Sequence, residues 1–237
     1  MPGAATAAVR SAIVQACRRL DATGLVAGAE GNVSARIGSR VVLVTPAGAR
    51  KGDLSASDIV RVRLDDGRAL GAGRPSSELP MHLAIYEARP DVVAVVHAHP
   101  PAATAFAVAG KAMPVTALAE LVGVIGPVPL VAYRDPGSAA LAAAVAAALA
   151  RGRRVRPNAC LLANHGVVAV GRSVAEALSR IESVEQAARI LTTAHILGGV
   201  TEIGPAAVKR LQRLHGRAAA ASPRRAIRQG IRRGRRA

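Results

Sequence analysis

Two histidines one residue apart, His97 and His99, close an apolar run that begins at Val92. The run predicts a buried β-strand, and residues two apart on a strand point to the same face, about 6.7 Å apart along it. Their imidazoles can therefore bind one metal ion. A third histidine, His165, lies between two further apolar runs. Three neutral imidazoles with one open position are typical of a catalytic zinc site rather than a closed structural one.

The segments that must position these histidines alternate between helices and short strands. Hydrophobic periodicity and turn residues predict helices over 4–20, 78–88, 102–109, 139–150 and 174–197. They also predict a glycine-rich turn that enters a strand within 28–36, and strands over 41–44, 59–64, 92–96, 128–131, 160–163 and 167–170. Several strands are joined by hairpin turns, and no G-x-G-x-x-G motif follows a strand. We therefore expect a three-layer α/β/α sandwich with a central, mostly antiparallel sheet rather than a Rossmann fold. Ser77 is expected to cap the helix that begins near Glu78.

Length and composition indicate one large domain. The chain has 237 residues, 51% of them hydrophobic, which can fill a substantial core. Cys17 and Cys160 are too few and too far apart to suggest a disulfide framework. No apolar run reaches the roughly 18 residues of a membrane span, and the N-terminus lacks the pattern of a secretion signal. These features favour a cytoplasmic protein with no membrane contact.

The positive charge is concentrated at the C-terminal end. The formal net charge is +17, and eleven of the 32 lysines and arginines lie between Lys209 and Arg236, where no acidic residue occurs. We therefore expect a catalytic domain over 1–205 and an Arg-rich tail over 206–237. Such a tail is usually a solvated segment, and contact with a polyanion is the alternative. No aromatic residue lies among these arginines, so any nucleic-acid contact is expected to be non-specific.

Five short motifs occur in one order along the chain. They are G-N-V-S-A-R (31–36), T-P-A-G (45–48), P-S-S-E (75–78), H-A-H-P (97–100) and N-H-G (164–166). Together they resemble the class II aldolase/adducin family, close to its fuculose-phosphate aldolase-like branch, over roughly Ala4 to Gly199. The resemblance implies that His97, His99 and His165 bind one divalent metal ion per subunit, usually Zn2+.

The resemblance also implies roles for residues around the metal. Glu78 would be the catalytic acid/base, and Asn32, Gly48, Ser76 and Ser77 would hold a substrate phosphate. Backbone and hydroxyl donors at a glycine turn and a helix N-terminus do form anion sites. The alternatives are structural: a carboxylate stabilised by the helix dipole, two capping serines, and a turn asparagine without ligand contact.

Two departures from the family pattern concern the substrate. Ala47 stands where the family often has a Ser or Thr that contributes to phosphate binding. Leu118 aligns with a Tyr that the aldolase branch uses as proton donor, and no Tyr occurs near the C-terminus. Glu120 is a candidate replacement by its place in the sequence. The phosphate site is therefore expected to be weaker, and the proton donor to differ or be absent.

The resemblance implies a metal-dependent aldolase, a lyase that cleaves a carbon–carbon bond of a small hydroxy-carbonyl compound such as a sugar phosphate through a metal-stabilised enediolate. A decarboxylase, epimerase or dehydratase of the same family, acting on a related sugar acid or sugar phosphate, is the alternative. A non-catalytic, adducin-like binding module is a third reading, although such modules typically lack the histidines. The family also implies a homo-oligomer, a tetramer with sites between adjacent subunits.

Overall fold

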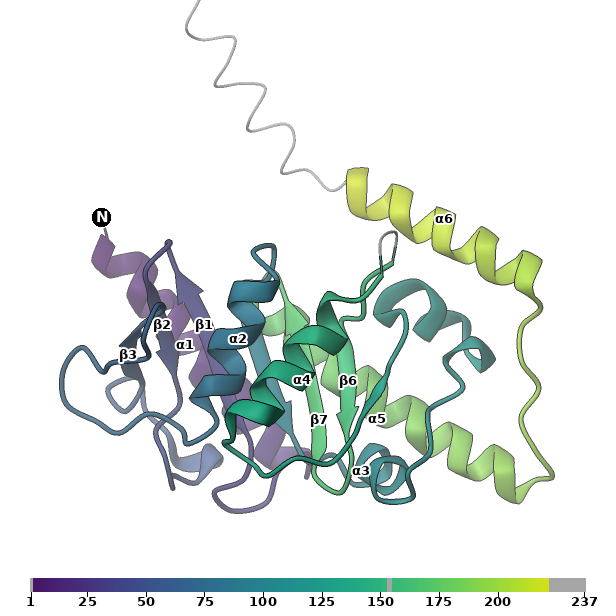
Figure 1. The fold of residues 1–237 in the computed structure, drawn as a ribbon, viewed down its shortest axis with the longest axis horizontal. Helices are drawn as coiled ribbons and strands as arrows, with labels where there is room; N and C mark the ends of the chain where they lie inside the picture. Colours follow the sequence, from purple (N-terminus) through teal and green to yellow (C-terminus); the bar gives the residue numbers. More distant parts are fainter. Residues whose placement is uncertain (1, 153–154, 222–237) are drawn as a thin grey trace, which may run out of the picture.

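A single sheet of seven strands forms the centre of the computed structural model, which describes residues 2–152 and 155–221 (Figure 1). The strand order is β3-β2-β1-β4-β7-β6-β5, and every neighbouring pair is antiparallel except β5 with β6. The strands are β1 (Asn32–Ile37), β2 (Val41–Val44), β3 (Val60–Arg63), β4 (Ala94–Ala98), β5 (Leu130–Val131), β6 (Ala159–Leu162) and β7 (Gly166–Gly171). The mostly antiparallel sheet predicted from the hairpin signals is confirmed.

Helices cover both faces of this sheet (Figure 1). The long helices are α1 (Pro2–Ala22), α2 (Leu79–Ala88), α3 (Pro101–Val108), α4 (Ala139–Ala150), α5 (Val174–Ile196) and α6 (Pro205–Ala221), and the short ones are η1 (Lys51–Asp53), η2 (Val115–Ala117) and η3 (Leu121–Ile125). Helices α2 and α4 share one hydrophobic core with the sheet, and α1, α3 and α5 share the other. The predicted three-layer α/β/α arrangement is therefore confirmed.

Strand β4 shows why the central strands are apolar throughout. Val95 belongs to the core under α2 and α4, whereas Ala94, Val96 and Ala98 belong to the core under α1, α3 and α5. Alternate side chains of a strand point to opposite faces, and both faces are covered here. His97 has the same parity as Val95, so it points to the face covered by α2.

The N-terminus of α2 differs from its prediction. The helix begins at Leu79, Pro80 lies in its first turn, and the preceding Glu78 makes no side-chain capping bond. Ser77 is exposed, and the hydroxyl of Ser76 instead accepts a hydrogen bond from the Glu78 N–H at 3.3 Å. The prediction that Ser77 caps this helix is therefore wrong, because the serine beside it supplies the acceptor.

Helix α6 was not predicted from the sequence. It packs against η3, beyond the end of α5 (Figure 1). The proposed boundary between residues 205 and 206 falls at its first turn, and residues 222–237 lie outside the described part of the chain. The division into a catalytic domain and a tail stays a prediction. Among the described helices, none is long and apolar enough to cross a membrane.

Candidate metal centre

Three histidine rings converge at one end of the sheet. His97 is in β4, His99 follows that strand, and His165 lies in the turn between β6 and β7. The Nε2 atom of His97 is 3.1 Å from that of His99 and 3.3 Å from that of His165. Their possible ligand atoms all lie within 4.8 Å of one another. One proton can join two such nitrogens but not all three, whereas a single divalent ion can accept all three lone pairs.

Local backbone chemistry allows this close approach. A Cβ atom on Gly166 would lie 2.6 Å from His99 Cδ2 and 2.6 Å from the Ala98 carbonyl oxygen, so only glycine fits between the strands here. Asn164 adopts a left-handed conformation with φ 56°, which asparagine tolerates better than most residues. The N-H-G turn therefore supplies the third histidine together with the space that it needs.

Partners on the outer side of the rings orient two of the ligands. His97 Nδ1 lies 3.0 Å from the Val167 carbonyl oxygen, to which it donates when Nε2 is left bare for a metal. His99 Nδ1 lies 3.2 Å from a Glu30 carboxylate oxygen. A carbonyl or carboxylate in this position fixes the tautomer of a metal-binding histidine. His165 Nδ1 is buried and has no hydrogen-bond partner in the described structure.

Burial favours the uncharged form of the His99 and His165 rings. It lowers the pKa of His165 to about 4, with a further contribution from the neighbouring His97. The same two causes lower the pKa of His99. Metal ions bind neutral imidazole, so the site is prepared for a cation at neutral pH.

Glu78 lies directly beside the three rings. Its Oε2 atom is 3.1 Å from His97 Nε2, and its Oε1 atom is 3.6 Å from His165 Nε2. The Asn32 side-chain amide donates to Oε2 at 2.8 Å. Burial by itself would raise the pKa of Glu78, but the attraction and hydrogen bonding of His97, with the Asn32 bond, hold it well below its usual range. The carboxylate is therefore ionised at neutral pH and can accept a proton.

The residues expected to bind phosphate lie on two adjacent loops and on β1. The turn 45–48 pairs with the loop 74–77: Ser76 N–H donates to the Thr45 carbonyl at 3.1 Å, and Ala47 N–H donates to the Arg74 carbonyl at 3.0 Å. Gly48 and Ser77 are exposed on these loops. Asn32 is buried, and its amide contacts Glu78 and His82 rather than facing the loops. Phosphate binding by this set stays a prediction.

One positioning residue was missed in the sequence. The Lys51 side chain is 1% exposed, and its ammonium donates to the carbonyls of Ala29 at 2.9 Å and Ala49 at 2.6 Å. Burial lowers the pKa of Lys51. The lysine therefore ties the segment that carries Glu30 to the turn that carries Gly48. No spacing signal marks it, because its partners are backbone carbonyls.

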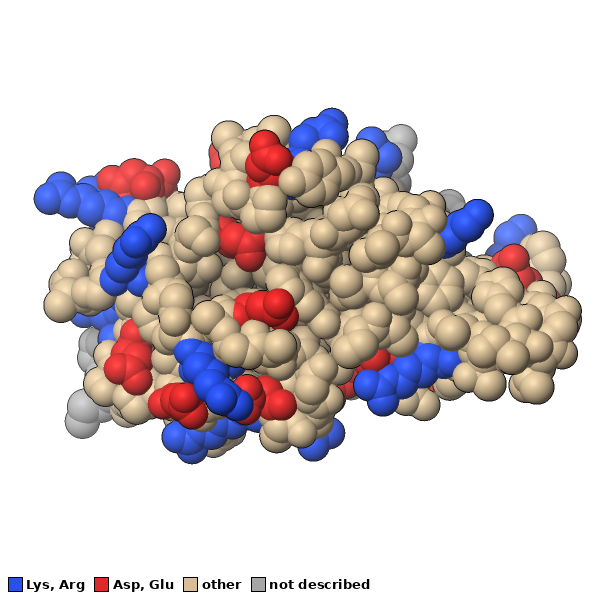
Figure 2. All heavy atoms as spheres, turned by 90° about the horizontal axis from the view of Figure 1, so that it is seen from below, with Lys and Arg blue, Asp and Glu red and all other residues tan. Residues whose placement is uncertain are grey.

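Charged side chains of both signs surround this end of the molecule. Figure 2 views the structure from below, the end at which α3 lies in Figure 1, and it shows acidic and basic side chains scattered around a broad uncharged area. Basic side chains form no continuous band on the described part of this face. The predicted non-specific polyanion contact concerns Lys209 to Arg236 and is not tested by this view.

Comparison with known proteins agrees with this geometry. The family described as class II aldolase and adducin N-terminal domain matches residues 11–192. The chain belongs to the class II aldolase and adducin family. Its fold is also that of solved members: it matches L-fuculose 1-phosphate aldolase with a TM-score of 0.78 and 29% identity, covering 86% of this chain and 94% of that one. YgbL from Klebsiella pneumoniae matches with a TM-score of 0.79 and 32% identity, covering 87% and 98%.

Relatives of this class II aldolase family member carry different reaction names. A 5-methylthioribulose-1-phosphate/5-deoxyribulose-1-phosphate aldolase of Rhodospirillum rubrum is 38% identical over 79% of this chain and 81% of that protein. A 3-oxo-tetronate 4-phosphate decarboxylase of Haemophilus influenzae is 32% identical over 78% and 88%. A methylthioribulose-1-phosphate dehydratase of Acidiphilium cryptum is 37% identical over 70% and 82%. The chain is thus an enzyme of the class II aldolase superfamily, and class II aldolases depend on a divalent metal.

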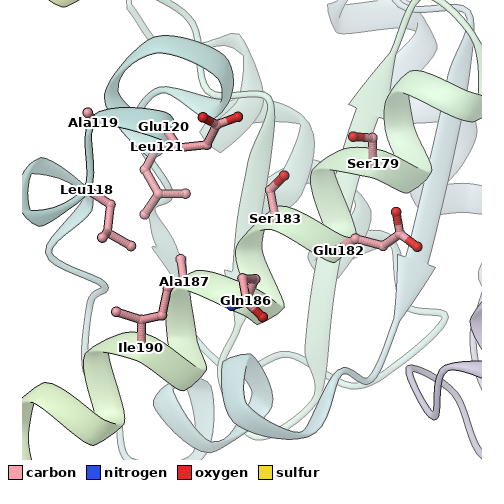
Figure 3. Close-up of a pocket in the computed structure, with 10 residues that line it drawn as sticks. All are labelled: Leu118, Ala119, Glu120, Leu121, Ser179, Glu182, Ser183, Gln186, Ala187 and Ile190. Atoms are coloured by element: carbon pink, nitrogen blue, oxygen red, sulfur yellow. The ribbon is translucent and has the colours of Figure 1, made fainter.

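The residues considered as replacements for the family tyrosine lie elsewhere in the fold. Leu118 and Glu120 line a pocket of about 350 Å3 between the η2–η3 segment and α5, shown in Figure 3. Glu182 and Ser183 of α5 line its other side. The three histidines and Glu78 are not among the residues that line this pocket. Within the described part of one chain, the structure therefore does not bring Leu118 or Glu120 to the metal centre.

Proposed function

We propose that this chain is a divalent-metal-dependent aldolase that cleaves the carbon–carbon bond of a small phosphorylated hydroxy-ketone. The observation that carries this proposal is the position of Glu78, whose Oε2 atom is 3.1 Å from His97 Nε2 at the converging histidines. A carboxylate beside an ion with an open position is suited to move a proton at a carbon next to a carbonyl. The names of the aldolase relatives support a ketose 1-phosphate as the class of substrate.

His97, His99 and His165 would hold the ion. When bound, a Zn2+ or another divalent cation would supply Lewis-acid stabilisation for the negative charge that develops on the substrate. Glu30 and the Val167 carbonyl keep two of the rings oriented toward that position. Removing such a partner typically weakens metal binding or activity by about 10- to 100-fold.

Glu78 would carry the proton. In cleavage of a ketose 1-phosphate, a hydroxyl loses its proton, the adjacent carbon–carbon bond breaks, and the electron pair stays on the phosphorylated fragment. That fragment then takes up one proton at carbon, so the products are an aldehyde and a ketone phosphate. The Glu78 carboxylate is ionised at neutral pH, so it has an oxygen free to take up the hydroxyl proton, which it would return to carbon. One residue can therefore serve both steps where the family tyrosine is replaced by Leu118.

A dehydratase or decarboxylase is the second candidate function. The replacement of the family tyrosine by Leu118 favours it, because these reactions do not require that donor to release an aldehyde. A non-catalytic, adducin-like module fits poorly with three histidines whose ligand atoms lie within 4.8 Å of one another. The homotetramer and the cytoplasmic location stay predictions from the family and the composition.

A product analysis separates these functions. The zinc-loaded protein would be incubated separately with a 5-deoxyketose 1-phosphate, a methylthioribulose 1-phosphate and a 3-oxo-acid phosphate. We expect dihydroxyacetone phosphate and an aldehyde from the first two, and Glu78→Gln should abolish their formation. Loss of water without cleavage would assign a dehydratase, and release of carbon dioxide from the third compound would assign a decarboxylase. Absence of all products, together with absence of bound metal, would favour a binding module.

A further inference from the structure

A buried row of polar side chains runs from Glu78 into the layer between the sheet and α2. Asn32 Nδ2 lies 2.8 Å from Glu78 Oε2, and Asn32 Oδ1 contacts His82 Nε2. The other ring nitrogen, His82 Nδ1, lies 2.7 Å from Ser34 Oγ, which lies 2.8 Å from the Tyr86 hydroxyl. Strand β1 supplies Asn32 and Ser34, and α2 supplies His82 and Tyr86 one helical turn apart.

The chemistry of each group fixes the direction of these hydrogen bonds. A carboxylate only accepts, so the Asn32 amide nitrogen must face Glu78 and its carbonyl oxygen must face His82. That oxygen also only accepts, so His82 must carry its proton on Nε2. A neutral ring protonated at Nε2 has a bare Nδ1, which accepts from the Ser34 hydroxyl. The Ser34 oxygen then accepts from the Tyr86 hydroxyl.

Burial keeps every member of the row in the required form. His82 and Ser34 are fully buried, and Tyr86 is 1% exposed. Burial lowers the pKa of His82 to about 3, so its ring is neutral at physiological pH. Burial also raises the pKa of the Tyr86 hydroxyl, which stays protonated. The polar side-chain atoms of Asn32, Ser34, His82 and Tyr86 each have a partner, as buried groups require, whereas Glu78 Oε1 at the end of the row has no hydrogen-bond partner in the described structure.

We infer that Tyr86, Ser34, His82 and Asn32 form a one-directional chain of hydrogen bonds, each donating toward Glu78, and that His82 is a positioning residue for the carboxylate. The inference rests on the proposed role of Glu78 in proton transfer. Hydrogen bonds in a chain of one direction polarise one another, so the Asn32 amide becomes a stronger donor to Glu78. The Asn32 bond to Oε2 fixes the rotation of the carboxylate, so that Oε2 faces His97 and Oε1 faces His165.

A tautomer measurement tests the direction without any substrate. Nitrogen-15 NMR of histidine-labelled protein reports which ring nitrogen carries the proton, and the His82→Gln variant identifies the His82 signals among those of the six histidines. At neutral pH we expect Nε2 protonated and Nδ1 bare. Tyr86→Phe should shift the Nδ1 signal because the far end of the chain is removed. A proton on Nδ1, or a signal unchanged by Tyr86→Phe, would overturn the inference.

Kinetics of paired variants tests the positioning role. His82→Leu removes the donor to Asn32, and we expect kcat to fall by about 10- to 100-fold with KM and metal content unchanged. His82→Gln retains an N–H donor and should keep most of the turnover. Ile85→Ala is the control, because it opens a cavity on the same helix without removing any of the hydrogen-bonded side chains. Below its unfolding temperature it should keep wild-type kcat.

The outcomes separate this inference from the proposed function. An equal loss of kcat in Ile85→Ala and His82→Leu would mean that packing alone is responsible, and the inference would be wrong. If His82→Leu does not fold, Tyr86→Phe still tests the inference. A continuous row of hydrogen bonds requires that Tyr86→Phe shifts the His82 Nδ1 signal and also lowers kcat, by less than the fall expected for His82→Leu. If the wild-type protein cleaves no ketose phosphate but the tautomer is as expected, the proposed function fails while the direction of the chain stands.

Discussion

The candidate metal centre and the adjacent loops 45–48 and 74–77 are built in different ways. At the metal centre, His97 and Glu78 are almost completely buried, and strand pairing places Asn32 opposite His97 in the β1–β4 register. In the turn 45–48 and the loop 74–77, Gly48 and Ser77 are exposed, and the bonds between the loops join backbone atoms. The first region is fixed by buried side-chain contacts at one end of the sheet, whereas the second is held by backbone pairing between loops.

The fold therefore determines where the histidines lie, whereas side chains on the two loops can change without moving the backbone. Moving one histidine would require a change in the packing between β4 and β7, because Gly166 leaves no spare volume. Changing a side chain at the loop position of Ala47 disturbs no backbone bond, since only its N–H is engaged. We therefore expect changes at the metal centre to affect the reaction as a whole and changes on the loops to affect substrate affinity.

The largest effect is expected from His97→Ala. It removes one of three protein ligands, so the metal content should fall from about one ion per chain to below about a tenth, with turnover lost in parallel. Elemental analysis after gel filtration measures this change. His195→Ala on the exposed surface of α5 is the control and should retain the metal. Full metal content in His97→Ala would show that the converging rings are not the binding site.

The next largest effect is expected from Glu78→Gln. The amide keeps the size of the side chain but cannot accept a proton, so kcat should fall by about 100-fold or more while the metal stays bound. Steady-state kinetics with parallel metal analysis measures both quantities. Glu87→Gln, near the exposed C-terminal end of the same helix, should leave kcat unchanged. Near wild-type turnover in Glu78→Gln would reassign this carboxylate to a structural role.

An intermediate effect is expected from Lys51→Met, which tests whether the two regions are independent. The substitution leaves the carbonyls of Ala29 and Ala49 without their donor in a buried place, which should lower the free energy of unfolding by about 1–3 kcal/mol. Urea denaturation measures this loss, and the exposed Lys111→Met is the matched control.

The same variant reports on both sites. Because Lys51 joins the segment of Glu30 to the turn of Gly48, metal affinity and phosphate inhibition should both weaken. If only metal affinity or only phosphate inhibition changes, Lys51 does not couple the two regions.

The sequence predicted which histidines come together better than it predicted their surroundings. The H-x-H spacing on an apolar strand is local information, and the ranges 41–44 and 139–150 agree with β2 and α4 because apolar runs with clear turn residues bound them. Contacts such as Lys51 with Ala29 or Glu30 with His99 depend on how distant segments meet, and no periodicity encodes them. Helix α6 was missed because its arginine-rich composition resembles that of a solvated tail.

The smallest effect is expected from Ala47→Ser, which would add a hydroxyl to the turn 45–48. One neutral hydrogen bond is worth roughly 0.5–1.5 kcal/mol, so inorganic phosphate should inhibit up to about tenfold more strongly. Competition kinetics measures this change, and kcat should stay the same because the metal centre is untouched. Ala47→Thr and Ala47→Val are nearly equal in shape, so only the threonine variant should reproduce the gain. Stronger phosphate inhibition in both variants would mean that packing, and not a hydrogen bond, is responsible. An unchanged phosphate affinity in the serine and threonine variants would mean that these loops do not bind the substrate phosphate.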